Sequence, residues 1–214
     1  MKKIKLFFCS FLLWPFLGFS QSTNANAKVY LLEDFTEGKA LMKNGSVETA
    51  EFNYDPLNQS IIFKKGKEVM TLTGLDEIDT VYIDNKKFVA LNNVAYEVAA
   101  SAPVSLLVSY SLKSKSLTAT TDHNGTSTQS TNQVSNTVSD AYMIRRYQGK
   151  FGYTIINQYW LKKGDRLYKA NTEKQIINMF PGKSNEINTY LENNKPDFNK
   201  VSHVGRLIKF CNTL

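Results

Sequence analysis

Histidine is the side chain best suited to acid–base chemistry near neutral pH, and the chain contains two, His123 and His203. His123 lies in a stretch rich in serine, threonine and asparagine, which offers little to hold it rigidly. His203 precedes Val204 in a segment with helical apolar spacing and falls outside the apolar face. Because a catalytic base needs a rigid supporting shell, we interpret both histidines as surface residues.

Four acidic residues, Asp76, Glu77, Asp79 and Asp84, could together hold a calcium ion in "GLDEIDTVYID". A calcium loop usually supplies alternating oxygen ligands around a glycine bend, whereas Ile78 interrupts this set. The pattern is more typical of a solvated turn between strands. We therefore predict no metal site and no cofactor.

Enzyme motifs with a known mechanism are missing from the chain. It has no Gly-x-Ser-x-Gly elbow, no His-Glu-x-x-His, no Cys-x-x-Cys and no Walker phosphate loop. Serine-hydrolase, zinc and nucleotide chemistry therefore have no support, and we predict no catalytic residue. The alternative is a hydrolase whose carboxylates meet only in the fold, since glycoside hydrolysis needs two acids about 5 to 10 Å apart.

Aromatic residues are densest in "GYTIINQYWLKKGDRLYKA", where Tyr153, Tyr159, Trp160 and Tyr168 could form a platform for a sugar or a peptide. Aromatic side chains also dominate cores in which a sheet packs against helices. The sequence favours the core and leaves the binding surface as an alternative.

The stretch "NYDPLNQSIIF" gathers polar side chains, among them Asn53, Asp55 and Asn58, next to an apolar run. Proline presets φ at the second position of a turn, and aspartate can bond back to the chain, so Asp55-Pro56 predicts the start of a hairpin turn. Asn58-Gln59 would complete the reversal. A binding role for this tip is the alternative, because loops on rigid scaffolds often carry function.

These candidates must be positioned by strands, because residues 28–112 show short apolar alternation broken by turn residues. Asn44-Gly45, Gly66-Lys67 and Asn85-Lys86 each separate two such runs, and Asn-Gly is a strong hairpin signal. The clearest alternation is "VSLLVSYSL", residues 104–112. The pattern predicts an antiparallel meander, or curved sheet, with one wet and one dry side.

The composition changes at residues 113–140, which are rich in serine, threonine, asparagine and glutamine. Their low apolar content predicts a mobile loop, because burial would not offset the entropy of ordering. A threonine-rich edge hairpin turned at Asn124-Gly125 is the alternative.

Strands resume up to residue 170, with the last pair turned at Gly164-Asp165, and the β-rich body is expected to span residues 28–170. The period then becomes helical over residues 171–214. Thr172 and Gln175 have capping-box spacing at the first helix. The third helical segment is weakened by Gly205. We predict an α+β fold in which three short helices pack on the sheet.

The N-terminus carries three lysines followed by an apolar run with Pro15 inside it, which is typical of a secretory signal peptide. The run is too short for a membrane-spanning helix, so we expect cleavage after Ser20, with Ala27 as an alternative. Residues 1–20 would then be removed, residues 21–27 would be a flexible N-terminus, and no transmembrane helix would remain.

Cleavage would also reduce the net charge from +7 to +4, because it removes three of 26 basic residues and none of 19 acidic ones. The remaining basic residues are scattered, so we predict no nucleic-acid partner. Cys211 would be the only cysteine left and could form no internal disulfide. Its helical apolar spacing predicts burial.

The segment from Lys39 to Leu91, with its glycine-turned hairpin, Asn-Tyr-Asp step and "VYID" and "KKFV" strands, resembles a group of uncharacterised exported proteins common in Bacteroidota. The C-terminal segment with "PDF" before its last helix extends the resemblance, which leaves out the Ser/Thr-rich middle. The resemblance implies export to the periplasm, the outer membrane or the cell exterior, and it brings no activity or site residues.

Export, a β-rich body and the missing catalytic motifs favour a non-enzymatic envelope or secreted binding protein. Its partner would be an envelope protein, a glycan or an apolar ligand. A carrier of lipid or another apolar ligand is the alternative, because helices across the mouth of a curved sheet can enclose an apolar cavity.

Overall fold

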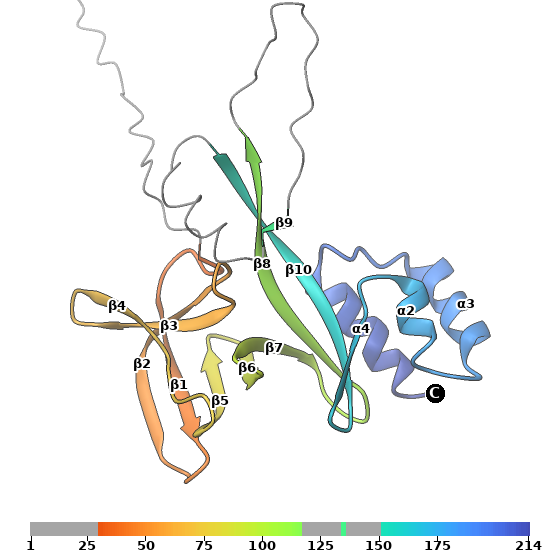
Figure 1. Cartoon of the computed structure of the whole chain (residues 1–214). Coiled ribbons are helices and arrows are strands. Elements are labelled where there is room, and N and C mark those ends of the chain that lie inside the picture. Colours follow the sequence, from red (N-terminus) through yellow and green to blue (C-terminus); the bar gives the residue numbers. More distant parts are fainter. Residues whose placement is uncertain (1–29, 117–133, 136–150) are drawn as a thin grey trace, which may run out of the picture.

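The computed structural model describes residues 30–116, 134–135 and 151–214 (Figure 1). In these residues eleven strands form one antiparallel sheet, in the order β11-β10-β8-β7-β6-β5-β1-β2-β3-β4, with β9 beside β8. The strands are β1 Thr36–Met42, β2 Val47–Asp55, β3 Ser60–Lys65, β4 Glu68–Thr71, β5 Ile78–Ile83, β6 Lys86–Leu91, β7 Val94–Ala100, β8 Ser105–Ser116, β9 Val134–Ser135, β10 Phe151–Lys163 and β11 Arg166–Lys169. Three helices follow, α2 Glu173–Ile177, α3 Ser184–Asn194 and α4 Val201–Cys211. The predicted α+β class is confirmed.

Four hairpins turn where the sequence predicts them, whereas β5 turns into β6 at Asp84-Asn85, one residue before the predicted Asn85-Lys86. The β1–β2 and β3–β4 turns contain Gly45 at φ 89° and Gly66 at φ 63°, in a region where side chains are strained. Gly164 turns β10 into β11 in the same way. The turn between β2 and β3 comprises residues 56–59, as the Asp-Pro step predicts.

One connection departs from the predicted meander. After β4 the chain returns to place β5 beside β1, so that β1 lies between β2 and β5. Gly38 in β1 permits this arrangement, because a Cβ atom there would lie 2.4 Å from the Tyr82 carbonyl oxygen in β5. Alternation alone cannot show which edge a returning strand will join, so the pairing of β5 with β1 was not predicted.

The sheet curls, and its concave side holds much of the core. Tyr54 of β2 stacks on Phe88 of β6 with ring centroids 5.7 Å apart, and it meets Tyr110 of β8 edge-on at 5.4 Å. All three side chains are buried. Strands far apart in the sheet order therefore pack across the curl.

Tyr54 also joins two strands at the point where they separate. β7 and β8 pair at Glu97 and Val108, and the same register would next place Ala95 opposite Tyr110. The Tyr54 hydroxyl occupies that position instead. It donates to the Ala95 carbonyl at 3.1 Å and accepts from the Tyr110 amide at 3.3 Å. The phenol thus satisfies two buried backbone groups that β7 and β8 no longer satisfy directly.

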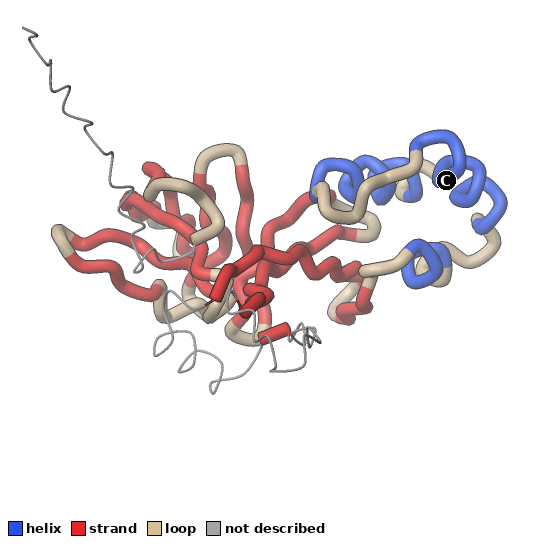
Figure 2. The backbone as a smooth tube through the Cα atoms, turned by 90° about the horizontal axis from the view of Figure 1, so that it is seen from above, coloured by secondary structure: helices blue, strands red, loops and turns tan. Residues whose placement is uncertain are grey.

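The helices gather at one end of the molecule (Figure 2). Helix α4 buries Val204, Leu207, Ile208 and Cys211, as its apolar spacing predicts, and it contacts β7 and β8. Gly205, which weakens the helix in isolation, faces the sheet. A Cβ there would lie 3.3 Å from the Ala99 carbonyl oxygen, so the glycine lets the helix approach the strand closely.

Two further predictions about this end of the chain are confirmed. Thr172 caps α2, because its Oγ1 accepts a hydrogen bond from the Gln175 amide at 3.3 Å. Cys211 is a buried free thiol, and burial raises its pKa to about 11. A high pKa keeps the sulfur in its unreactive thiol form at neutral pH.

The predicted loop or edge hairpin at residues 113–140 lies mostly outside the described residues. Within it, β8 continues to Ser116, and Val134 and Ser135 pair with Lys113 and Leu112. Likewise, the expected signal segment and flexible N-terminus fall outside the described residues.

The buried tyrosines predict alkaline unfolding. Desolvation raises the pKa of Tyr159 to about 12 and raises those of Tyr54 and Tyr110 further above the usual value, and the Glu97 charge adds to the effect on Tyr110. The unfolded chain therefore loses these protons at lower pH, so stability should be unaffected below about pH 10 and fall as the pH rises from about 10 to 12. The part of the tyrosinate absorbance that comes from these buried phenols should appear only as the circular dichroism changes. Ionisation of these phenols near pH 10 with the fold intact would contradict the prediction, and a titration in denaturant supplies the reference.

Candidate functional site

A cleft of about 510 Å³ lies between the β2–β3 turn and the outer face of β7 and β10. We call it the Trp160 cleft. Its aromatic walls are Tyr96 and Trp160, and its polar lining is Asn58, Gln59, Gln158, Lys169 and Asn171. Leu57 and Val94 complete it. The volume lies within the range of about 300–1,000 Å³ that is usual for small-molecule sites.

The β2–β3 turn forms one wall because its own bonds hold it in place. The Asp55 carboxylate accepts from the Leu57 amide at 2.9 Å and from the Asn58 side chain at 2.6 Å. Gln59 adopts φ 51°, and its carbonyl accepts from the Ala95 amide at 2.9 Å. The turn is therefore attached to the start of β7.

The aromatic wall is also held by neighbouring groups. Trp160 donates its indole N–H to the Ser109 hydroxyl at 3.3 Å, and its ring meets Tyr96 edge-on at 6.4 Å between centroids. Lys169 places its ammonium 5.9 Å from the centre of the indole ring, within cation–π range. These contacts leave the Trp160 ring only partly buried, where a ligand can reach it.

Three of the four amides are anchored at one atom, and their other polar atom has no partner among the described residues. Asn58 uses its Nδ2 on Asp55, which leaves Oδ1. Gln158 donates its Nε2 to the Ser111 hydroxyl at 3.2 Å, which leaves Oε1. Asn171 accepts the Tyr159 amide on its Oδ1 at 2.7 Å, which leaves Nδ2. Each side chain is thus oriented before a ligand binds, and preorganisation of this kind favours affinity.

Among the described residues that line the Trp160 cleft there is no carboxylate, histidine or cysteine. Its titratable side chains are Lys169 and Tyr96, and both residue types can take part in acid–base or nucleophilic catalysis. Asp55 lies behind the turn and is occupied by Leu57 and Asn58. The lining consists mainly of amide and aromatic side chains, which suit ligand binding.

The structure separates the four predicted aromatic residues. Tyr153, Tyr159 and Leu161 share one face of β10, and Tyr168 pairs with Leu161 on that face. Tyr159 is buried at 2% exposure and donates to the Phe198 carbonyl at 2.6 Å. The Tyr153 hydroxyl is buried, and Tyr168 is exposed. Trp160 alone faces the cleft, so the four residues do not form one surface.

The three residues of the predicted hairpin tip are also separated in the structure. Asn53 lies inside β2, fully buried, and binds the N-terminal segment through Leu32 and Asp34. Asp55 stabilises the turn, as predicted. Asn58 is exposed and lines the cleft. Asn58 from the predicted hairpin tip and Trp160 from the predicted aromatic group therefore both line the Trp160 cleft.

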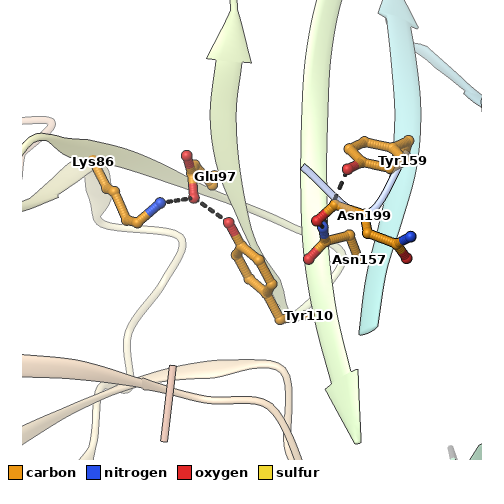
Figure 3. A network of polar contacts seen from close by, with 6 residues as sticks. All are labelled: Lys86, Glu97, Tyr110, Asn157, Tyr159 and Asn199. Atoms are coloured by element: carbon orange, nitrogen blue, oxygen red, sulfur yellow. Dashed lines mark hydrogen bonds and ion pairs between the residues drawn. The ribbon is translucent and has the colours of Figure 1, made fainter. Parts of the chain in front are cut away.

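Two polar networks outside the cleft lining support the fold (Figure 3). Glu97 is buried, pairs with Lys86 at 2.8 Å and accepts a hydrogen bond from the Tyr110 hydroxyl. On β10, Asn157 donates to the Asn199 carbonyl at 2.9 Å and so fixes the segment before α4. Among the described residues, Glu97 is the buried carboxylate, and burial is a common property of catalytic acids. Its carboxylate is occupied by Lys86 and Tyr110, so we interpret it as a residue that stabilises the fold.

A second, larger cavity of about 640 Å³ lies on the outer face of β6, β7 and β8. Val89, Leu91, Val98 and Leu107 line its floor. Five charged residues also line it, namely Lys43, Lys87, Lys162, Asp76 and Asp79. Glu77 and Asp84, the other members of the acidic set, do not line it. Within the described ranges, no group of three or more potential metal-ligating side chains occurs.

His203, the histidine that the structure describes, makes a hydrogen bond that stabilises the fold. His203 accepts the Asp197 amide on Nδ1 at 3.3 Å, which holds the turn before α4. His123 lies outside the described residues.

Sequence reasoning missed Tyr96, Gln158, Lys169 and Asn171. One signal was present for Gln158, because its spacing of two from Trp160 places both on one face of a strand. The other three come from β7, β11 and the segment before α2, and only the strand order brings them together.

No helix in the part of the chain that the structure describes is long and apolar enough to cross a bilayer. The chain matches no protein-family model, and searches of curated proteins and of solved structures found no match.

Proposed function

We propose that this chain is an exported, non-enzymatic binding protein of the cell envelope or cell exterior, and that the Trp160 cleft is its ligand site. The observation that carries the proposal is the meeting of Asn58 and Trp160, from distant segments, in one cleft whose amides are already oriented. Export is supported by the N-terminal lysines and apolar run, and by the resemblance to exported Bacteroidota proteins.

Binding is favoured over hydrolysis because the cleft lacks the pair of carboxylates that glycoside hydrolysis requires. It is also favoured over an apolar carrier. The concave side of the sheet is filled by Tyr54, Phe88 and Tyr110. The larger cavity has an apolar floor, but an apolar ligand there would also meet three lysines and two aspartates. A ligand that enters the Trp160 cleft meets five polar side chains, Asn58, Gln59, Gln158, Lys169 and Asn171.

The test uses the chain from Gln21 onward, which contains every described residue and in which Trp160 is the only tryptophan. Immobilised protein is exposed to an envelope extract of a Gram-negative Bacteroidota cell, and the retained compounds are identified by mass spectrometry. Trp160→Ala should raise the dissociation constant of the retained ligand at least about thirtyfold, because an aromatic anchor of a binding site typically contributes about 2 kcal/mol or more.

Tyr168→Ala is the matched control, because Tyr168 is an exposed aromatic residue on the neighbouring strand β11 and lies outside the cleft. This variant should retain the ligand as the parent does. Equal retention by Trp160→Ala and the parent, with both folded, would show that the cleft is not the site. Turnover of a retained compound would show that the protein is an enzyme.

A further inference from the structure

We infer that the ligand of the Trp160 cleft is a carbohydrate, an inference that rests on the proposed function and names its ligand class. The cleft presents partly exposed aromatic surface next to hydrogen-bonding groups of both kinds, with one cation and no anion in its lining. A pyranose ring has the complementary chemistry, because its C–H face is apolar and its rim carries hydroxyl groups.

The aromatic walls fit the apolar face of a sugar. Trp160 and Tyr96 lie nearly perpendicular, with 83° between their ring planes, so they form a corner and not a flat platform. Tyr96 is buried and backs this corner, whereas Trp160 is the more accessible ring. A sugar ring stacked on the indole would cover apolar surface that is otherwise partly in water.

The polar atoms left without a partner in the described chain fit hydroxyl groups. Asn58 Oδ1 and Gln158 Oε1 are acceptors, while Asn171 Nδ2 and Lys169 Nζ are donors. Gln59 can supply either. A hydroxyl both donates and accepts, so neighbouring hydroxyls on one ring can satisfy this mixture.

Other ligand classes fit less well. An apolar ligand would leave several oriented amides without hydrogen-bond partners, at about 1–3 kcal/mol for each group that becomes buried. A phosphate offers only acceptors when fully ionised and would face the two amide oxygens. A cationic ligand would meet Lys169 with no carboxylate in the lining to balance it. The set therefore favours neutral saccharides and also admits acidic ones, whose carboxylate could pair with Lys169.

The test is a fluorescence titration of the same chain, from Gln21 onward, with defined compounds. The panel contains neutral oligosaccharides of glucose, mannose and xylose, chitin oligomers and oligogalacturonates, set against amino acids, dipeptides and nucleotides. At least one saccharide should change the Trp160 emission saturably, and the amino acids, dipeptides and nucleotides should not. Gln158→Ala should weaken that binding about tenfold, because it removes one hydrogen-bonding group. Tyr168→Ala should leave it unchanged.

The outcomes separate this inference from the proposed function. If the envelope extract yields a ligand that depends on Trp160 but no saccharide binds, the carbohydrate assignment is wrong and the binding function stands. If a saccharide binds equally well to Trp160→Ala, measured by calorimetry, the sugar site lies elsewhere and the assignment to this cleft is wrong. If neither extract nor panel yields a ligand, both are overturned.

Discussion

Tyr54→Ala is expected to lower the free energy of unfolding by about 3–5 kcal/mol, the range for removing a large buried aromatic side chain. The Tyr54 side chain is fully buried and packs against Phe88 and Tyr110 across the curl of the sheet. Its loss would leave a cavity at the centre of the concave core and would release the two backbone groups that the hydroxyl bridges. Urea unfolding followed by circular dichroism measures the change.

Tyr54→Phe separates the hydroxyl from the ring. The variant keeps the packing but leaves the Ala95 carbonyl and the Tyr110 amide without their bridge, so we expect a loss of about 1–3 kcal/mol. Tyr82→Phe is the matched control, because Tyr82 is 42% exposed on β5 and its change should stay within about 0.5 kcal/mol. A Tyr54→Phe variant as stable as the parent would show that β7 and β8 do not depend on the phenol.

Gly38→Ala is expected to lower the free energy of unfolding by about 1–3 kcal/mol, because the added methyl group overpacks the sheet. The new Cβ would lie 2.4 Å from the Tyr82 carbonyl oxygen and 2.9 Å from a ring carbon of Phe52. The ring can shift, but the carbonyl belongs to the backbone of a paired strand. Urea unfolding measures the loss, and Phe52→Leu in the same chain should not restore the lost stability.

Gly205→Ala supplies the comparison for a second buried glycine. There the nearest atom to a new Cβ is the Ala99 carbonyl oxygen at 3.3 Å, and alanine also favours the helix by about 1 kcal/mol. The two effects oppose each other, so we expect a net change below about 1 kcal/mol. If Gly205→Ala proved as harmful as Gly38→Ala, the difference in clearance at the two sites would not be what determines the outcome.

Local features of the fold could be predicted because short-range chemistry determines them. Asn44-Gly45 and Gly66-Lys67 supply positive φ, Thr172 caps its helix, and Ile208 and Cys211 follow a helical period. Each of these signals acts within a few residues. The α+β class followed from their sum.

Long-range pairing could not be predicted in the same way. Alternation in β5 shows which side chains share a face, but it does not show that the strand returns to β1. The Trp160 cleft could not be predicted for the same reason. Asn58 and Trp160 were each candidates in the sequence, but they meet only because the curl of the sheet brings the β2–β3 turn to β7 and β10.

The β2–β3 turn has two roles, and together they imply a thermodynamic linkage. Its Gln59 carbonyl attaches one end of the curled sheet to Ala95, and its Asn58 and Gln59 side chains line the cleft. A molecule in the cleft would therefore bind only while this attachment is closed, and each occupied site would oppose opening by RT ln(1 + [L]/Kd). A bound ligand would stabilise the contact between the β2–β3 turn and β7, so an occupied protein would resist heat and proteases better than an empty one.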